Sequence, residues 1–297
     1  MKNEKDVPDF LYKKLLNQYG EEKTNKIIEG YSKQRKVTLR VNTIKTDINT
    51  IKSELDKAQI EYREVFWNKT ALIIQNVREE EIRKLKIYEE GEIYLQSLSS
   101  MIPSIIIEPK TNENILDMAA APGGKTAQMA AISKNKSIIT ACEKNKIRAE
   151  RLKYNLQKQG VTCTYVMAVD SRKLDNFFSF DKILLDAPCS GSGTIYTLGK
   201  MQITEELINR SVKTQEELLQ KALNILKHGG EMVYSTCSIL LEENEKVLEK
   251  VLSKYNAEII PIKMEGISQL PTSIEGTICV LPTELYEGFF VAKIKKR

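Results

Sequence analysis

The stretch that most constrains this chain is residues 114–126, which read NILDMAAAPGGKT. A short apolar run ends at Asp117, a turn of small residues follows, and a helix is predicted from residue 125 to residue 133. Glycines let the backbone approach a ligand closely, and the free N–H groups of a helix start point at whatever is bound there. A strand, a tight turn and a helix in this order therefore predict a ligand site at the end of a strand.

From this stretch onward, predicted strands alternate with predicted helices. Strands are expected at residues 115–118, 137–141, 162–169, 181–185, 231–235, 258–262 and 289–294, and the longer helices between them at residues 144–159, 205–227 and 242–255. This alternation predicts an α/β fold with a doubly wound, mostly parallel Rossmann-like sheet. Ligands of such sheets lie at the carboxyl ends of the strands.

The residues before this sheet predict a smaller attachment. Two short helices are expected at residues 7–20 and 22–31, and then a strand, a helix and two strands at residues 37–42, 47–57, 61–66 and 71–74. A short helix at 79–85 and an apolar helix at 95–107 lead into the main sheet. We expect N-terminal helices over residues 1–35, a small α+β domain over 36–90 and the main domain over 91–297.

Composition narrows the class of protein. No apolar run is long enough to span a membrane, and the first residues lack the apolar segment of a signal peptide, so a cytoplasmic location is expected. Five cysteines without CxxC spacing and a single histidine argue against a disulfide scaffold or a structural metal. The net charge of +5 fits a polyanionic partner, and the cluster of Lys33, Arg35, Lys36 and Arg40 offers phosphate contacts.

Three acids and two thiols stand where predicted strands end. Glu143 follows the second strand at the spacing of a ribose-binding acid, and Asp170 follows the third, where it can accept a hydrogen bond from an adenine amino group. Asp186 and Cys189 follow the fourth strand, and Cys237 follows the fifth. Together these groups indicate an adenosine-containing cofactor beside reactive thiols.

The glycine turn lacks the phosphate-binding fingerprints of other adenosine cofactors, and this narrows the type of cofactor. The dinucleotide fingerprint GxGxxG is absent, which argues against NAD and FAD. Gly124, Lys125 and Thr126 match the tail of a P-loop, but Ala119 stands where its first glycine would be and Pro122 removes an N–H group. A P-loop nucleotide hydrolase therefore stays an alternative. S-adenosyl-L-methionine needs no phosphate cradle and is favoured.

The thiols extend this prediction to a reaction. Cys142, Cys163 and Cys279 are expected to be small core residues, whereas Cys189 and Cys237 lie just past strand ends, facing the cleft. The C5 carbon of cytosine is too electron-poor to attack a methyl sulfonium. Addition of a thiolate at C6 makes C5 enamine-like, so that C5 can take the methyl group.

At these residues the chain resembles the Nop/Sun family of S-adenosylmethionine-dependent RNA (cytosine-5) methyltransferases. The resemblance rests on DMAAAPGGKT at residues 117–126, LDAPCSG at 185–191 and YSTCSILLEEN at 234–244, with weaker support from LRVNTIK at 39–45 and YLQSLSSMIP at 94–103. It implies a methyltransferase catalytic domain and an RNA-recognition-like domain before it. In place of Ala119, members of the family often have a cysteine.

The resemblance also implies roles for single residues. Cys237 would be the nucleophile on C6, Cys189 would assist release of the methylated RNA, and Asp186, oriented by Lys125, would bind the cytosine edge. The cofactor would be held by Ala119, Ala120, Ala121, Pro122, Gly123, Gly124, Lys125, Glu143, Asp170 and Asp186. No metal is implied.

The expected partner is RNA. The short helices ahead of LRVNTIK are similar to those of bacterial members that act on ribosomal RNA, so ribosomal RNA is favoured and transfer RNA comes next. A monomer is expected. The long loop at residues 190–204, with three glycines, is a candidate cover over the target base. A non-catalytic RNA-binding protein on the same fold remains a further alternative.

Overall fold

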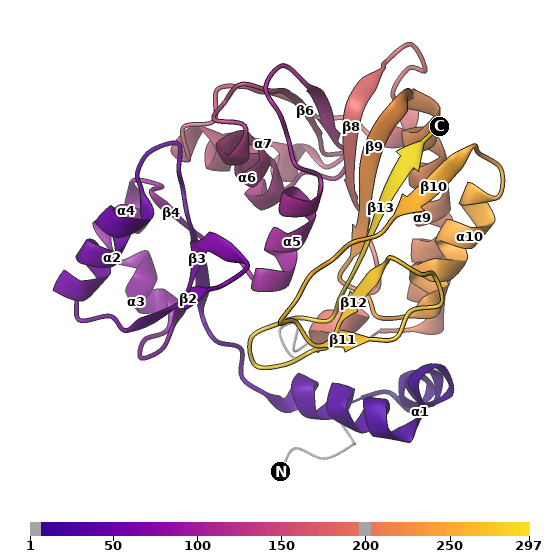
Figure 1. Cartoon of the computed structure of the whole chain (residues 1–297), viewed down its shortest axis with the longest axis horizontal. Helices are drawn as coiled ribbons and strands as arrows, with labels where there is room; N and C mark the ends of the chain where they lie inside the picture. The colour runs from indigo at the N-terminus through magenta and orange to yellow at the C-terminus, as the bar shows by residue number, and fades with distance from the viewer. Residues whose placement is uncertain (1–6, 196–202) are drawn as a thin grey trace.

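The computed structural model describes residues 7–195 and 203–297. In Figure 1 a small sheet with its helices lies on the left, a large sheet lies on the right, and helix α1 runs beneath the large sheet. The candidate cover at residues 190–204 falls partly outside the described residues. Of this loop, Ser192–Thr194 forms the short 3₁₀ turn η3.

The small sheet has four strands in the order β2-β3-β1-β4. Its strands are β1 (Thr38–Val41), β2 (Tyr62–Val65), β3 (Asn68–Ile74) and β4 (Ile93–Leu95), and its helices are α2 (Ile48–Lys57), α3 (Glu79–Arg83) and α4 (Lys86–Glu89). Asp47 caps α2 by accepting from the backbone N–H groups of Asn49 and Thr50. Because β4 pairs with β1, the small sheet extends past residue 90.

The large sheet has the order β11-β12-β13-β9-β8-β5-β6-β7, and β10 pairs with β13. Its strands are β5 (Asn114–Asp117), β6 (Ile138–Cys142), β7 (Thr164–Met167), β8 (Phe180–Asp186), β9 (Leu226–Thr236), β10 (Ala257–Ile260), β11 (Gln269–Leu270), β12 (Ile278–Val280) and β13 (Phe289–Lys296). The five strands from β9 to β7 are parallel, which confirms the predicted sheet. The remaining strands extend it in the antiparallel sense.

Both faces of the large sheet are covered. Side chains alternate along each strand: Val233 of β9 faces the layer of α5 (Leu98–Ile106) and α6 (Gly124–Ile132), while Met232 and Tyr234 face α9 (Glu205–Ile225) and α10 (Glu245–Leu252). Helix α7 (Lys146–Lys158) packs beside α6. This alternation is the period-2 pattern of a strand that is buried on both sides.

Helix α1 (Asp9–Ser32) belongs to the core of the large sheet. Its axis breaks at Gly20, where φ is 73°, so it forms the two helical segments that the sequence predicts. Leu11, Leu15 and Ile27 are fully buried in the same cluster as the α9 and α10 side chains. The N-terminal helices therefore pack on the large sheet.

Several short elements differ from the sequence prediction. The apolar stretch at residues 95–107 is not one helix, because Ile93–Leu95 forms β4 and the side chain of Ser97 caps a helix that begins at Leu98. Strands β11 and β12 and helix α4 were not predicted. They span two to four residues each, which is too short to display a periodic pattern.

Candidate functional site

A buried carboxylate fixes the glycine turn after β5 by hydrogen bonds. Gly123 has φ 110°, in the left-handed region, and a Cβ there would lie 3.0 Å from the Leu152 side chain. Asp117, at the end of β5, accepts hydrogen bonds from the hydroxyl of Thr126 at 2.7 Å and the backbone N–H of Ala119 at 3.4 Å. The strand and the helix are thus tied across the turn.

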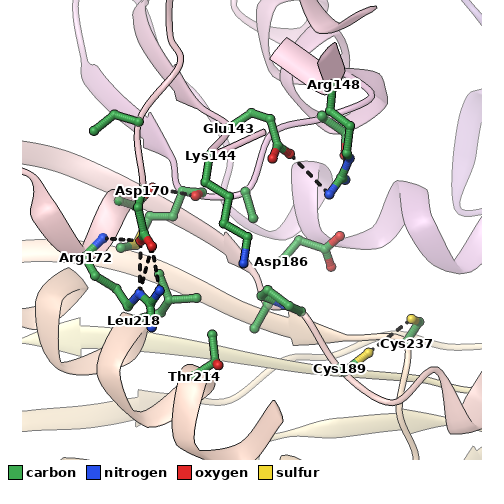
Figure 2. Close-up of a pocket in the computed structure, with 17 residues that line it drawn as sticks. Glu143, Lys144, Arg148, Asp170, Arg172, Asp186, Cys189, Thr214, Leu218 and Cys237 are labelled. Carbon is green, nitrogen blue, oxygen red and sulfur yellow. Dashed lines mark hydrogen bonds and ion pairs between the residues drawn. The ribbon is translucent and has the colours of Figure 1, made fainter. Parts of the chain in front are cut away.

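A cavity of about 230 Å³ lies beside this turn, at the ends of β5, β6 and β7. Glu143, 4% exposed, accepts from the backbone N–H of Asn145 at 2.8 Å, and its other oxygen lies 3.4 Å from Nη1 of Arg148. Figure 2 shows Glu143, Asp170 and Asp186 around this cavity, with both cysteines at one end. The structure therefore brings together the three acids predicted from the sequence.

Asp170 is occupied by a neighbouring guanidinium. Arg172 donates to both of its carboxylate oxygens, and Asp170 also accepts from the Arg172 backbone N–H at 3.1 Å. These hydrogen bonds hold the pKa of Asp170 below its ordinary value, so the carboxylate is ionised at neutral pH. Arg172 also pairs with Glu217 of α9, which fixes the guanidinium between two carboxylates.

Asp186 is the acid nearest the thiols in sequence, and it is held from two sides. Nζ of Lys125 lies 2.8 Å from one of its oxygens, and the Ser235 hydroxyl donates to the other at 2.8 Å. Lys125 also donates to the hydroxyl of Ser100 at 2.6 Å. Burial alone would lower the pKa of Lys125, but the Asp186 carboxylate outweighs it and raises the pKa, so the lysine is charged.

The two thiols lie close together at the same edge of the large sheet, where its parallel strands end. This edge is called the rim below. Sγ of Cys189 lies 3.2 Å from Sγ of Cys237, and both side chains are half-buried. The hydrogen bond to Cys237, burial and the negative charge of Glu243 raise the pKa of Cys189 well above its ordinary value. Cys189 is therefore a thiol at neutral pH and can donate its S–H to Cys237.

A second cavity, of about 510 Å³, opens on the other side of Asp186. It lies between the small sheet and the large one, and its lining includes Arg35, Lys36, Tyr94, Gln96, Ser97, Ser100 and Lys125. Ala119, Ala121, Asp186 and Cys237 line both cavities. The two cavities thus meet at an acid and a thiol.

The turn predicted to hold the cofactor is divided between these cavities. Ala119 and Ala121 line the first cavity together with Glu143 and Asp170. Ala120, Pro122, Gly124 and Lys125 line the second, and Gly123 lines neither. The backbone of the turn thus forms a wall between the two spaces.

The predicted basic cluster is only partly available to a ligand. Arg40 is 1% exposed and donates to the side-chain oxygens of Gln96 and Gln159, so its prediction as a phosphate contact was wrong. Lys33 pairs with Glu29. Arg35 and Lys36 line the second cavity.

Sequence reasoning missed several residues of the rim. Ser100 and Ser235 contact the Lys125–Asp186 pair, and Glu243 contacts the serines beside both cysteines. Ser235 and Glu243 both lie in YSTCSILLEEN, so for these two the matching motif carried a signal. Ser100 lies in the weaker match YLQSLSSMIP, but nothing in that stretch connects its hydroxyl to Lys125 and Asp186.

Neither a metal site nor a membrane segment is found in the described part of the chain. Within residues 7–195 and 203–297, no three His, Cys, Asp or Glu side chains gather as metal ligands would. No helix of these residues has the length and apolar character needed to cross a bilayer.

Comparison with known proteins agrees with this architecture. A family model described as "16S rRNA methyltransferase RsmB/F" matches residues 104–295, and one described as "Methyltr_RsmF/B-like, ferredoxin-like domain" matches residues 7–79. The solved structure of a methyltransferase homolog protein from Pyrococcus horikoshii superposes with a TM-score of 0.84 at 32% identity, covering 98% of this chain and 100% of that one.

Named relatives act on two kinds of RNA. The chain is 36% identical to the 28S rRNA (cytosine(4447)-C(5))-methyltransferase of Homo sapiens over 97% of its own length, but it spans only 38% of that protein. It is 33% identical to the tRNA (cytosine(49)-C(5))-methyltransferase of Pyrococcus abyssi over 96% of both chains. The chain belongs to the Nop/Sun family of methyltransferases.

Proposed function

We propose that this protein transfers a methyl group from S-adenosyl-L-methionine to C5 of a cytosine in RNA, through a covalent bond between Cys237 and C6. One observation carries the proposal: two cavities meet at Asp186 and Cys237. A methyl donor in one cavity and a base in the other would face each other at a thiol. Family membership supports the same reaction, since the named relatives are cytosine-C5 methyltransferases.

The first cavity suits the adenosine part of the cofactor. Glu143 keeps an oxygen that is held only by a long contact to Arg148, so it can accept from a ribose hydroxyl. Asp170, ionised and pointing at the same cavity, can accept from an adenine amino group once Arg172 yields one of its contacts. When bound, S-adenosylmethionine supplies an electrophilic methyl group.

The second cavity suits an unpaired base. Asp186 faces it with an oxygen held by Lys125, and a carboxylate at this place can accept from the exocyclic amino group of cytosine. To enter, the cytosine must leave its stack, because C5 and C6 are otherwise covered by neighbouring bases. Tyr94 and Phe289 add aromatic surface to the lining, which suits a base.

The thiols divide the chemistry between them. The Cys237 thiolate forms a bond to C6, and the electrons of the C5=C6 double bond move to C5, which then takes the methyl group. A base in the cleft removes the C5 proton, the double bond re-forms, and the C6–S bond breaks to return the thiolate. Cys189, 3.2 Å away and protonated, donates a hydrogen bond to the leaving sulfur.

Ribosomal RNA is the favoured substrate and transfer RNA comes next. The larger family model is described by 16S rRNA, whereas the relative that matches over nearly its whole length acts on transfer RNA. A P-loop nucleotide hydrolase is not favoured, because Pro122 leaves the turn without an N–H that a phosphate cradle would use.

The proposal is tested by incubating the protein with labelled S-adenosylmethionine and unmodified ribosomal or transfer RNA. Nuclease digestion and mass spectrometry then identify the product. We expect 5-methylcytidine from one of the two RNAs, its loss in Cys237→Ala, and its retention in Cys163→Ala, which changes a half-buried thiol that lines neither cavity. Label in another nucleoside, or full turnover by Cys237→Ala, would overturn the proposal.

A further inference from the structure

Glu243 is a fully buried carboxylate behind the two cysteines. It lies in the 3₁₀ turn η4 (Leu241–Glu243), and its side chain is 0% exposed. Burial raises the pKa of Glu243 above its ordinary value, and hydrogen bonds from Ser190 and Ser238 oppose this rise. Its contacts are with groups that can donate, which suits an ionised carboxylate.

These contacts join the two loops that carry the thiols. One oxygen accepts from the backbone N–H of Ser190 at 2.7 Å, and the other accepts from the hydroxyls of Ser190 at 2.6 Å and Ser238 at 2.5 Å. Ser190 follows Cys189 and Ser238 follows Cys237 in the chain. A single carboxylate thus connects the residues next to both sulfurs.

Further hydrogen bonds make this connection rigid. The hydroxyls of Ser192 and Ser238 lie 2.8 Å apart, and the Gly193 N–H donates to the carbonyl of Cys237 at 2.9 Å. The Tyr234 hydroxyl donates to the Glu243 carbonyl at 2.6 Å, so the turn itself is fixed. Buried networks of this kind hold their members in one arrangement, because an unpaired member would be costly.

We propose that Glu243 is the positioning residue that sets the distance between Cys189 and Cys237 and, through its negative charge, keeps Cys189 in the thiol form. The geometry gives the first part, since Glu243 bonds to both loops and touches neither cavity. The second part follows from a buried charge close to a thiol, because the protein interior screens charge weakly. The separate catalytic roles of Cys189 and Cys237 rest on the proposed function, but the position of the Glu243 charge beside them does not.

Among the ionisable groups near Cys189, Glu243 is the one whose negative charge has no cationic partner in the described part of the chain. Cys237 follows β9, Tyr234 lies on it, and Glu243 comes from η4. Asp186, at the end of β8, lines the first cavity together with Cys189. Asp186 is neutralised by Lys125. Glu243 has no cationic partner among the described residues, so its charge acts on the thiol unopposed.

The experiment needs no RNA. Alkylation of each cysteine by iodoacetamide is followed by peptide mass spectrometry from pH 6 to pH 10 in wild type, Glu243→Gln and Glu242→Gln. Glu243→Gln keeps an acceptor for Ser190 and removes the negative charge. The profile of Cys189 alkylation rate against pH should therefore move to lower pH. Below the midpoint of the wild-type profile, Cys189 of the variant should be alkylated on the order of tenfold faster. Glu242→Gln changes the adjacent acid, which is paired with Lys14, and should leave the profile unchanged.

A second variant separates position from charge. Glu243→Ala leaves both serines without their acceptor, so oxidation by diamide, which joins neighbouring thiols, should form the Cys189–Cys237 disulfide several-fold more slowly than in Glu243→Gln. An unshifted Cys189 profile in Glu243→Gln would overturn the electrostatic part, and equal rates of disulfide formation in the two variants would overturn the positional part. If the wild type proved inactive on every RNA while both shifts occurred, the proposed function alone would fail.

Discussion

At the scale of single residues, the rim is built from acids in different electrostatic states. Asp117 is buried under the turn, Asp170 is held by Arg172, and Asp186 is paired with Lys125. A carboxylate with a cation beside it stays ionised, whereas one surrounded by apolar atoms and a hydroxyl resists ionisation. Two predictions follow from this difference.

Asp117 should make stability depend on pH. Burial raises its pKa to about 6, from an ordinary 3.8. The folded state holds this proton more tightly than the unfolded chain, so protonated Asp117 adds to the free energy of unfolding. This stabilisation is complete below pH 3.8 and is lost as the pH rises through 6. The loss is on the order of 3 kcal/mol, since one pKa unit is worth about 1.4 kcal/mol.

The matched variant is Asp117→Asn, which cannot ionise. Urea unfolding at intervals from pH 4 to pH 7 should show the free energy of unfolding of the variant rising relative to wild type over this range. Other titrating groups affect both proteins alike, so the difference isolates Asp117. Two curves that stay parallel from pH 4 to pH 7 would contradict the assignment.

Asp170 should contribute to cofactor affinity. Asp170→Ala removes the acceptor proposed for the adenine amino group, and we expect S-adenosylmethionine to bind about tenfold more weakly, as for the loss of one charge-assisted hydrogen bond. Isothermal titration calorimetry measures this directly. Asp175→Ala is the control, because that exposed acid lies in the following loop outside the cavity. An unchanged dissociation constant for Asp170→Ala would remove it from the site.

At the scale of elements, α1 supports the loops of the site from beneath. The Tyr19 hydroxyl donates to the Ile239 carbonyl at 2.5 Å, and Gln18 accepts from the Leu241 N–H at 3.0 Å, so the segment after Cys237 rests on this helix. Tyr31 donates to the Ser192 carbonyl on the other thiol loop. The helix predicted as an attachment is thus part of the catalytic domain's core.

Shortening a buried side chain of α1 should therefore destabilise the catalytic domain. Leu15 is fully buried, and Leu15→Ala should cost about 2–5 kcal/mol through lost transfer energy and the cavity left behind. Lys13→Ala, at an exposed position of the same helix, should change the stability little. Thermal unfolding of the two variants side by side measures the difference, and equal midpoints would mean that α1 packs only loosely.

The elements that the sequence predicts well are those with long periodic patterns. Helices α2, α7 and α9 and the five parallel strands were all expected, because their apolar residues recur over enough positions. The strand-end acids and thiols followed from the topology alone. The contacts of Ser100, Ser235 and Glu243 did not follow, although each residue lies in a matching stretch, because these contacts join segments distant in sequence.

At the scale of the whole molecule, the second cavity is lined by residues from both the small and the large part of the structure. Arg35 and Lys36, in the segment between α1 and β1, line it opposite the rim residues Lys125 and Asp186. Two cations at the approach to a base cavity suit the phosphates that flank a target nucleotide. The small domain would then act on the same nucleotides as the catalytic domain.

Lys36→Ala should weaken RNA binding uniformly across sequences. We expect the slope of log binding constant against log salt to fall by about one, because one phosphate contact and its released counterion are lost. Lys57→Ala, a helix α2 lysine paired with Glu54 and outside the cavity, is the control. Fluorescence anisotropy with an oligoribonucleotide at several salt concentrations decides between them, and equal slopes in wild type and Lys36→Ala would exclude the contact.

The central claim is that Cys237 forms a covalent bond with the target base while Cys189 assists its release. The most direct measurement incubates Cys189→Ala with S-adenosylmethionine and cellular RNA and then isolates RNA that stays with the protein through a denaturing gel. The account predicts an adduct that sequencing places on ribosomal or transfer RNA, and that disappears when Cys237 is also replaced by alanine. An adduct that survives the loss of Cys237, or methylation by wild type with no adduct in Cys189→Ala, would contradict the roles given to the two thiols.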